Sequence, residues 1–493
     1  MQINTTSPSA LDRRNIPHLR ELPADLETPV SVYLKLAGKS PSFLLESVTG
    51  GEQLARYSFI GVGPSRAYLI YGHTLHTVNL TGERQAQVQA LPGDQDPMDA
   101  LRQVLANQAC QPLPGLPRFS GGLVGYMSYE MMRFFEPSVK LEAHPELPDA
   151  VFLLADTLVA FDHAFGKILL IGNPGPDASA EEVEARLDEI EKRLAAPLPA
   201  SPAPRPAVPA NKRANMSADA FCNAVLAAKE HIAAGDIFQV VLSQRMSRET
   251  NAHAFDIYRS LRRLNPSPYM FFFDFDELVS KEPLYLIGAS PEMHVRLEER
   301  IAAIRPIAGT RRRGQTPAED AALEKELLAD PKERAEHVML VDLARNDLGR
   351  VCDFGTVQVK DLMVIERYSH VMHIVSQVQG CLSAGRTPYD LMRATFPAGT
   401  LSGAPKIRAM QIIAELEQTA RGPYGGCVGY FSFNGNLDCC ITIRTALLKD
   451  GKAHVQSGGG WVNDSTPEGE FQETVNKAKA MISAVAWAEG FSP

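Results

Sequence analysis

Cysteine is scarce in this chain, and its few residues follow no repeated spacing. Disulfide-stapled folds use closely and regularly spaced cysteines, whereas scattered single cysteines are typical of proteins in a reducing compartment. The sequence therefore argues against a disulfide framework. The seven positions are Cys110, Cys222, Cys352, Cys381, Cys427, Cys439 and Cys440.

Long uninterrupted apolar runs are also missing. One of the most apolar stretches, residues 151–161, contains Asp156 and is too short to cross a bilayer core of about 30 Å. The first fifteen residues lack the apolar segment of a secretory signal. We therefore expect a cytoplasmic protein rather than a membrane-bound or secreted one.

The chain has no excess of positive charge and no nucleotide-binding fingerprint. Its formal net charge is −9 and its pI is near 5.8, which disfavours general attraction to nucleic acid or anionic membranes. Neither a P-loop nor a dinucleotide motif occurs, and no repeat of fixed period indicates a solenoid or propeller. An anionic substrate would have to be bound by local groups.

The composition is that of a globular protein long enough for two structural units. Hydrophobic residues make up 45% and charged residues 22% of the 493 positions. One stretch rich in proline and alanine, residues 197–213, reads as an extended linker. It would separate an N-terminal region, residues 1–196, from a C-terminal region, residues 214–493.

Strand-like segments dominate the part of the chain beyond this linker. They are rich in β-branched and aromatic residues and alternate with helices and hairpin-like turns. This pattern predicts an α+β fold with large, mainly antiparallel sheets. Clear examples are YMFFFDF, YLIGASPEMHVRL, GGCVGYFSF, CCITIRTALL and AHVQSGGGW.

A first pair of carboxylates stands at the start of a predicted helix. Asp330 is the expected N-cap, Pro331 the first helical residue and Gly349 the expected stop. Glu333 and Glu336 are spaced i, i+3 and therefore project from one face of the first turns. Alone, such glutamates simply complement the helix dipole.

A second helix start repeats the same design. Ser465 or Thr466 is the expected cap, Pro467 opens the helix, and Glu470 and Glu473 are again spaced i, i+3. If the two helices face each other, their carboxylate oxygens form a set of hard ligands suited to Mg²⁺. The spacing within each helix does not decide whether they do.

Several cationic and glycine-rich positions suit an anion. Strand alternation in CCITIRTALL places Cys440, Thr442 and Arg444 on one face, and arginine is the preferred bidentate partner of a carboxylate. The run 457–460 would let backbone N–H groups approach an anion, or serve as a glycine turn. Lys477 shares a helical face with the second carboxylate pair.

Three polar positions are each open to a structural and a functional interpretation. Thr400 and Ser402, in the glycine-rich loop before a helix entered at residues 404–406, either donate to a substrate or cap the turn. His373 lies within an apolar strand, where a buried structural histidine is more common than a catalytic one.

One apparent nucleophile motif lacks its context. Residues 425–429, GGCVG, match the G-x-C-x-G pattern of glutamine amidotransferases. A cysteine nucleophile needs a histidine base oriented by a third group, and no His-x-Glu follows in the sequence. Glutaminase activity in this chain is therefore not expected.

The motifs of the C-terminal region together resemble those of chorismate-utilising enzymes, most closely the anthranilate synthases. The similarity extends over nearly the whole chain and is densest from Asn215 to Val485. It implies a fold of large antiparallel sheets packed as a sandwich with flanking helices. The matching segments are GDIFQVVLSQR, NPSPYMFFF, GASPE, RPIAGTRRRG, AEHVMLVDLARNDLGRV, YSHVMHIVSQVQG, GTLSGAPKIRAM, RGPYGGCVGY, IRTALL and GEFQETVNKA.

The resemblance implies a role for each matching position. The magnesium ligands are Glu336 and Glu473, supported through water by Glu333 and Glu470. Glu292 assists loss of the C4 hydroxyl, Thr400 contacts the substrate, and His373 is needed for the chemistry. The positions that hold chorismate are Gly309, Thr310, Tyr424, Arg444, Gly458, Gly459, Gly460 and Lys477.

Two positions distinguish between members of this family by their nucleophile. Aminodeoxychorismate synthases typically carry a lysine that attacks chorismate where this chain has Ala308. Isochorismate and salicylate synthases carry a water-activating lysine where this chain has Gln239. The resemblance therefore favours external ammonia attacking C2, followed by loss of pyruvate. The alternatives are an aminodeoxychorismate synthase and a non-catalytic anion-binding protein that uses residues 457–460 and 311–313.

The resemblance also implies a partner and a regulator. Ammonia would come from glutamine through a separate amidotransferase subunit. The N-terminal region would be regulatory or structural, and residues 214–493 would form the chorismate-binding catalytic region. Tryptophan would inhibit from a remote site. Its predicted residues are Glu46, Ser47, Pro268, Tyr269 and Met270.

Overall fold

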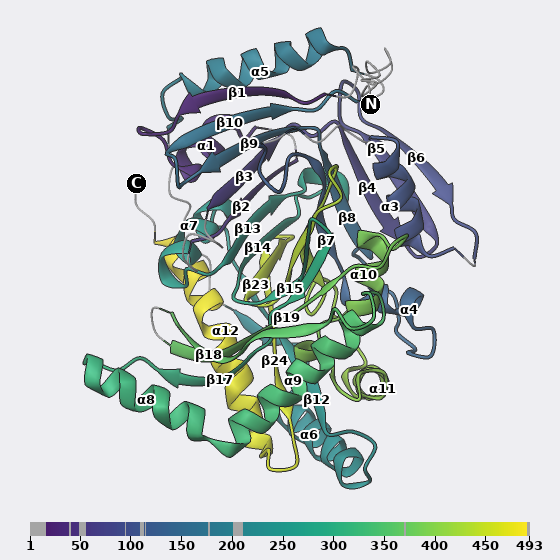
Figure 1. The fold of residues 1–493 in the computed structure, drawn as a ribbon, viewed down its shortest axis with the longest axis vertical. Coiled ribbons are helices and arrows are strands. Elements are labelled where there is room, and N and C mark those ends of the chain that lie inside the picture. Colours follow the sequence, from purple (N-terminus) through teal and green to yellow (C-terminus); the bar gives the residue numbers. More distant parts are fainter. Residues whose placement is uncertain are drawn as a thin grey trace, which may run out of the picture.

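The fold is built from two large antiparallel sheets stacked face to face with helices on their outer sides (Figure 1). The computed structural model describes residues 16–38, 41–48, 56–93, 95–108, 113, 115–175, 178–200, 211–368 and 371–490. Each sheet contains 12 described strands. The predicted α+β class with mainly antiparallel sheets is confirmed.

The first sheet, sheet A, joins strands from both ends of the sequence. In Figure 1, the purple N-terminal strands continue into the teal and yellow C-terminal ones. The short β20 (Gly403–Ala404) pairs with β12 outside the main order. That order is β1 (His18–Pro23), β10 (Lys167–Gly172), β9 (Thr157–Asp162), β3 (Tyr57–Val62), β2 (Ser42–Glu46), β13 (Tyr269–Asp274), β14 (Tyr285–Ser290), β23 (Thr445–Lys449), β24 (Lys452–Trp461), β12 (Gln239–Glu249) and β11 (Lys212–Ala214).

The second sheet, sheet B, mixes the two halves in the same way. Here β18 (Gln358–Arg367) pairs with β19 outside the main order. That order is β17 (Ile307–Arg312), β19 (Val371–Cys381), β16 (Ile301–Ile304), β15 (Met293–Glu298), β22 (Leu437–Ile441), β21 (Cys427–Ser432), β7 (Gly122–Met127), β8 (Ala150–Ala155), β4 (Arg66–Tyr71), β5 (Thr74–Asn79) and β6 (Gln85–Ala90).

The expected regions 1–196 and 214–493 therefore share both sheets. Strand β2 of the N-terminal region pairs with β13, and β7 pairs with β21. The predicted linker, 197–213, contains positions 201–210, which lie outside the described residues. Its last two residues are already part of β11, which pairs with β12.

A core of alternating apolar side chains fills the space between the sheets. Because successive strand residues point to opposite faces, each strand supplies this core with every second side chain. Phe43 and Phe273 of sheet A stack there, and Tyr126 of sheet B meets Phe275 edge to face. Aromatic pairs of this kind add stabilisation beyond the area they bury.

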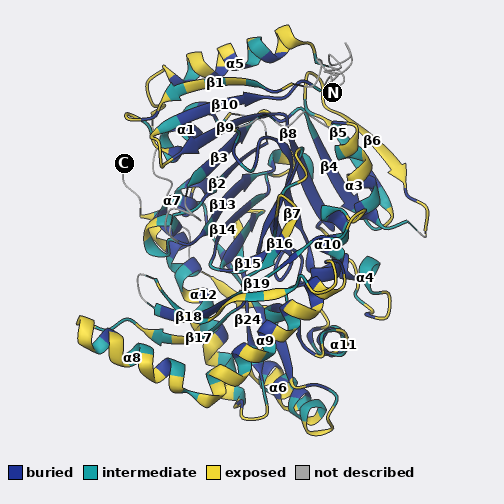
Figure 2. Cartoon of the chain, in the orientation of Figure 1, coloured by how far each residue is buried: buried dark blue, intermediate teal, exposed yellow. Residues whose placement is uncertain are grey.

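Helices cover the outer face of sheet A. Helix α5 shows why: Ser179 caps it with a capping box, and its apolar stripe, including Leu187 and Leu194, is buried while its other face is exposed (Figure 2). The covering helices are α1 (Pro29–Leu36), α5 (Ala180–Leu194), α7 (Ala254–Leu264) and α12 (Pro467–Glu489).

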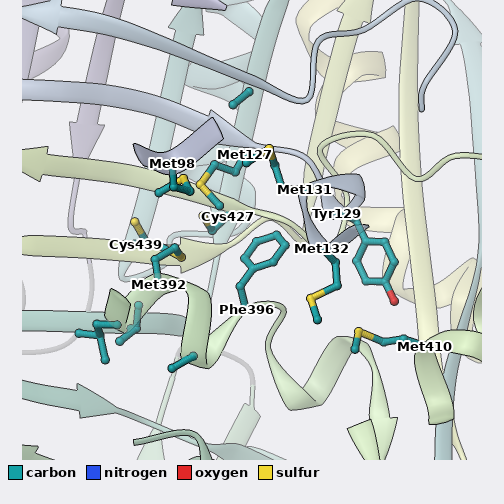
Figure 3. Close-up of a cluster of buried hydrophobic side chains, with 14 of the residues drawn as sticks. Met98, Met127, Tyr129, Met131, Met132, Met392, Phe396, Met410, Cys427 and Cys439 are labelled. Carbon is teal, nitrogen blue, oxygen red and sulfur yellow. The ribbon is translucent and has the colours of Figure 1, made fainter. Parts of the chain in front are cut away.

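A second group of helices covers sheet B and the β12 end of sheet A. Their core is rich in sulfur: Figure 3 shows six methionines around Phe396, with Cys427 and Cys439 beside them. Methionine fills irregular gaps between helices well because its side chain is unbranched. The helices are α3 (Pro97–Ala106), α4 (Met132–Phe135), α6 (Ala218–Ala233), α8 (Pro317–Ala329), α9 (Pro331–Gly349), α10 (Pro388–Thr395) and α11 (Lys406–Glu417). Among the described helices, none is both long and apolar enough to pass through a membrane.

The chain crosses between the sheets at two places that position the site. It leaves β14 of sheet A and enters β15 of sheet B through Pro291 and Glu292. It returns from β22 to β23 through residues 442–444. Both crossings lie beside the end of β24, which pairs with β23 only from Lys452 to Val455.

Candidate functional site

A cavity of about 500 Å³ opens at these two crossings. Its size falls within the range of small-molecule sites. All of the residues predicted for catalysis, substrate binding and metal binding line it, although they come from many separate segments of the sequence. They are Glu292, Gly309, Thr310, Glu333, Glu336, His373, Thr400, Tyr424, Arg444, Gly458, Gly459, Gly460, Glu470, Glu473 and Lys477.

Helix α9 presents the first carboxylate pair as the sequence predicts. The Asp330 side chain accepts hydrogen bonds from the backbone N–H groups of residues 332 and 333 and so caps the helix. Gln239 Nε2 donates to Glu336 Oε1 at 3.1 Å. Burial and the neighbouring Glu333 raise the pKa of Glu336.

Helix α12 presents the second pair opposite the first. Thr466 stands at the N-cap position, but its side chain makes no capping bond. Lys477 Nζ lies 2.5 Å from Glu473 Oε1 and also donates to the Gly458 carbonyl at 3.0 Å. Burial and the nearby Glu473 raise the pKa of Glu470, whose Oε2 is buried without a hydrogen-bond partner. The two predicted pairs therefore do line one cavity.

The glycine run forms part of a strand, as the segment AHVQSGGGW predicts, so the alternative of a glycine turn is wrong. Residues 458–460 belong to β24 and pair with residues 241–243 of β12. A Cβ at Gly458 would lie 2.5 Å from the Leu242 carbonyl oxygen, and one at Gly460 would lie 2.6 Å from Gln239 Nε2. Glycine therefore lets the backbone of β12 and a polar side chain approach this strand closely.

Arg444 lines the cavity, but it does not lie on the strand face that the sequence predicts it to share with Cys440 and Thr442. The segment CCITIRTALL is two strands in different sheets, β22 and β23, joined at the crossing. Arg444 turns the chain there with a φ of 51°, in the left-handed region that non-glycine residues seldom adopt. Burial lowers the pKa of Arg444, and nearby Tyr424 and Glu473 oppose this.

Glu292, at the other crossing, is a protonated acid at neutral pH. Burial raises its pKa to about 8, and the Thr400 hydroxyl donates to its Oε1 at 3.0 Å. A buried carboxyl group of this kind can give a proton to a leaving hydroxyl.

His373 is a neutral imidazole on β19, as the sequence predicts. Its Nδ1 lies 3.0 Å from the Gly309 carbonyl and 3.1 Å from Thr310 Oγ1. Because a carbonyl only accepts, Nδ1 carries the hydrogen and Nε2 is left as the basic nitrogen. Burial lowers the pKa of His373. Gly309 makes this contact from a bulge in β17 with a φ of 70°.

The four glutamates have the oxygen ligands that a divalent cation prefers, but their side chains are not yet arranged around a common point. As they stand, no three His, Cys, Asp or Glu side chains of the described residues are grouped to hold a metal. However, Glu470 has an unpartnered buried oxygen, and the pKa values of Glu336 and Glu470 are raised. A set of oxygen donors whose charges repel one another, with one buried oxygen lacking a partner, suits Mg²⁺.

Comparison with known proteins decides the family. The model of the chorismate binding enzyme family matches residues 41–483. This chain belongs to that family. Anthranilate synthase component 1 from Acetivibrio thermocellus is 48% identical over 488 residues, covering 97% of this chain and 96% of the relative.

Two solved structures of chorismate-binding enzymes show the same architecture. Anthranilate synthase component I from Streptococcus pneumoniae TIGR4 is 37% identical with a TM-score of 0.77, covering 93% of this chain and 98% of that one. MenF, the menaquinone-specific isochorismate synthase from Escherichia coli, has a TM-score of 0.72 over 96% and 95% of the two chains. At 18% identity it shows the fold alone. The predicted sandwich with flanking helices is confirmed for this member of the chorismate-binding enzymes.

Positions 308 and 239, at which related enzymes are expected to carry a lysine, both line the cavity of this chorismate-binding enzyme. Ala308 lies on β17 and Gln239 at the start of β12. Gln239 is engaged with Glu336 by its amide. Neither position therefore supplies an amine to attack a substrate.

The predicted tryptophan residues gather at a separate, smaller cavity of about 50 Å³. Strands β2 and β13 pair there, with Met270 opposite Glu46. The Glu46 carboxylate bonds to Tyr258 and Arg262 of α7, whereas Tyr269 donates to Asp438 at 3.0 Å. All five predicted residues, Glu46, Ser47, Pro268, Tyr269 and Met270, line this cavity.

Sequence reasoning gave no role in the catalytic cavity to several polar groups in it or beside it, among them Gln456. Lys332 and Ser465 also line the cavity, and Arg311 Nη1 donates to Glu333 Oε1 at 3.3 Å. The available signals were adjacency to the carboxylate pairs for Lys332 and Ser465 and the GTRRRG segment for Arg311.

Replacing Glu292 tests its buried, protonated state. An ordinary glutamate pKa is 4.5, so between that value and about 8 the folded chain holds a proton that the unfolded chain has released. The unfolding free energy of the wild type therefore falls with rising pH, by at most about 1.4 kcal/mol per pH unit.

Glu292→Gln has no titrating group at this position, so its unfolding free energy does not share the fall expected for the wild type. We therefore expect the unfolding free energy of the variant minus that of the wild type to increase between about pH 5 and pH 8. Urea unfolding across this range measures the difference, with the exposed Glu298→Gln as the matched control. A stability difference that does not change with pH would show that Glu292 is ionised in the folded chain.

Proposed function

We propose that this chain converts chorismate and ammonia into anthranilate and pyruvate, as the chorismate-binding subunit of an anthranilate synthase. One observation carries the proposal. A single cavity combines cationic side chains, two carboxylate pairs, a protonated acid and a neutral histidine, with no lysine at positions 239 or 308.

The carboxylates of chorismate would be held by the cations of the cavity. Arg444 lies at the crossing and lines the cavity, where a guanidinium can bind a carboxylate bidentately. Lys477 lies beside the backbone of Gly458. The four glutamates, Glu333, Glu336, Glu470 and Glu473, would hold Mg²⁺, which supplies a positive charge that orients and neutralises a substrate carboxylate.

The reaction then needs proton transfers in both of its stages. Ammonia attacks C2 as the Glu292 carboxyl protonates the departing C4 hydroxyl, which leaves as water. The new ammonium group then gives up a proton, which restores the Glu292 carboxyl and gives aminodeoxyisochorismate. In the second stage the ring proton at C2 is removed, the bond between C3 and the enolpyruvyl oxygen breaks, and the enolpyruvyl methylene carbon gains a proton, so that pyruvate leaves and the ring becomes aromatic. Nε2 of His373 is the basic nitrogen available to remove the ring proton.

A separate amidotransferase subunit would release the ammonia from glutamine. The relatives described above are component 1 proteins, which indicates a second component. Within this chain, Cys427 of the G-x-C-x-G match is buried in β21 among core methionines (Figure 3). A cysteine in that position is a packing residue rather than an exposed nucleophile.

Tryptophan would inhibit through the small cavity at β2 and β13. At about 50 Å³ this cavity is well below the usual size of a small-molecule site, so binding requires its walls to move apart. Strand β13 continues sheet A towards β14, whose end leads directly to Glu292. Such a movement would therefore reach the catalytic cavity through the sheet.

The direct test is the reaction of the purified chain with chorismate, ammonium and magnesium. We expect fluorescent anthranilate and an equal amount of pyruvate without any partner, and less of both when tryptophan is added. An aminodeoxychorismate product would identify the para-directing alternative. Unreacted chorismate would contradict the proposal and favour a binding protein.

Replacing His373 tests its place in the chemistry. Loss of a positioned proton-transfer group typically costs 10²–10⁴ in rate, so we expect kcat of His373→Ala to fall roughly by that factor. Chorismate affinity should change little. His231→Ala, on α6 outside the cavity, is the control. A fall in affinity with unchanged kcat would make His373 a binding residue instead.

A further inference from the structure

A second sizeable cavity lies on the other side of sheet A from the catalytic one. It has a volume of about 390 Å³ and is enclosed between β11, β12 and β24 on one side and α12 with the start of α6 on the other. It shares only Val455 with the lining of the catalytic cavity. Its volume is that of a small-molecule site.

One end of this cavity is cationic. Arg248 of β12 and Lys212 of β11 lie directly opposite each other in the antiparallel register, so their side chains share the face that lines the cavity. Like charges in directly opposed positions are destabilising. No acidic side chain of the described residues lines this cavity.

Polar atoms at the cavity are buried without partners. Arg248 is 8% exposed, and its Nε has no hydrogen-bond partner, although its Nη2 pairs with Glu489 from outside the lining. Gln244, four residues earlier on the same face of β12, is 1% exposed, and its Oε1 is also unpartnered. Unsatisfied buried polar atoms are costly. The Arg248 Nε–H is a donor, so an anionic oxygen of a ligand would satisfy it, whereas Gln244 Oε1 only accepts and would need a separate donor.

Most of the remaining lining is apolar, and its other polar residues are Arg213, Ser217 and Ser247. Met246 lies between Gln244 and Arg248 on β12, and Phe471, Ile482 and Val485 face it from α12. An apolar body would therefore rest between the strand and the helix, with its charged end at Arg248. Aliphatic and aromatic side chains with a few placed polar groups are the usual lining of such sites.

We propose that this cavity binds a small monocarboxylate with an aliphatic or arylalkyl body, held by Arg248 and Lys212. The site is distinct from both the catalytic cavity and the small cavity at β2 and β13. It reaches α12 on the side away from Glu473, and Gln244 Nε2 donates to Thr474 Oγ1 at 2.6 Å. A bound ligand would thus contact the helix that carries the second carboxylate pair.

Calorimetric titration of the full chain with octanoate tests this proposal, with octanamide as the neutral comparison. We expect one saturable octanoate site per chain and weaker binding of octanamide. Removing the Arg248 guanidinium by Arg248→Gln together with Glu489→Gln, so that no carboxylate is left unpaired, should weaken octanoate binding roughly tenfold to a hundredfold. Lys212→Gln, at an exposed position, should weaken it as well.

Two further variants locate the bound molecule. Val485→Trp fills the cavity and should abolish binding, whereas Arg444→Gln alters only the catalytic cavity and should leave octanoate binding unchanged. No saturable binding, equal binding of octanamide, or loss of binding in Arg444→Gln would overturn the proposal. Loss of binding in Arg444→Gln would show that octanoate binds in the catalytic cavity. This conclusion would hold whether or not the chain makes anthranilate.

Discussion

Arg444 lines the cavity because the chain has to pass from sheet B to sheet A between β22 and β23. At that point the residue adopts a left-handed conformation, and its side chain enters the space beyond the end of β23. The second crossing, at Glu292, borders the same space. The exchange of strands between the sheets therefore creates the cavity and supplies two of its chemically active groups.

The cavity brings together charges that would be unfavourable without a ligand. Partial burial raises the pKa values of Glu336 and Glu470 and lowers that of Arg444. A dicarboxylate and a divalent cation bound together would offset the charge that this burial leaves uncompensated. This complementarity supports the proposal that the site binds both.

Local signals in the sequence predicted the helix starts well. Asp330-Pro331 and Thr466-Pro467 begin α9 and α12 where expected, because caps and first-turn prolines act within a few residues. The resemblance to chorismate-utilising enzymes then indicated which side chains would meet. Spacing along the chain alone could not show that α9 and α12 face one cavity, since that depends on packing between distant segments.

The errors arose where tertiary structure overrides a local pattern. CCITIRTALL alternates like one strand, yet its two halves pair with different sheets. The glycines of β24 also allowed a turn, but they are strand residues, and the Leu242 carbonyl oxygen and the Gln239 side chain approach them closely. Contacts such as Arg311 with Glu333 join residues 22 positions apart and have no local signature.

Chorismate affinity with and without magnesium tests the shared site most directly. Calorimetry in the absence of ammonia measures binding alone. The structure predicts that magnesium tightens chorismate binding to the wild type, and that Glu336→Gln with Glu473→Gln removes this effect while magnesium-independent binding at Arg444 persists. An affinity that magnesium does not change, or an effect that survives in the double variant, would contradict the account.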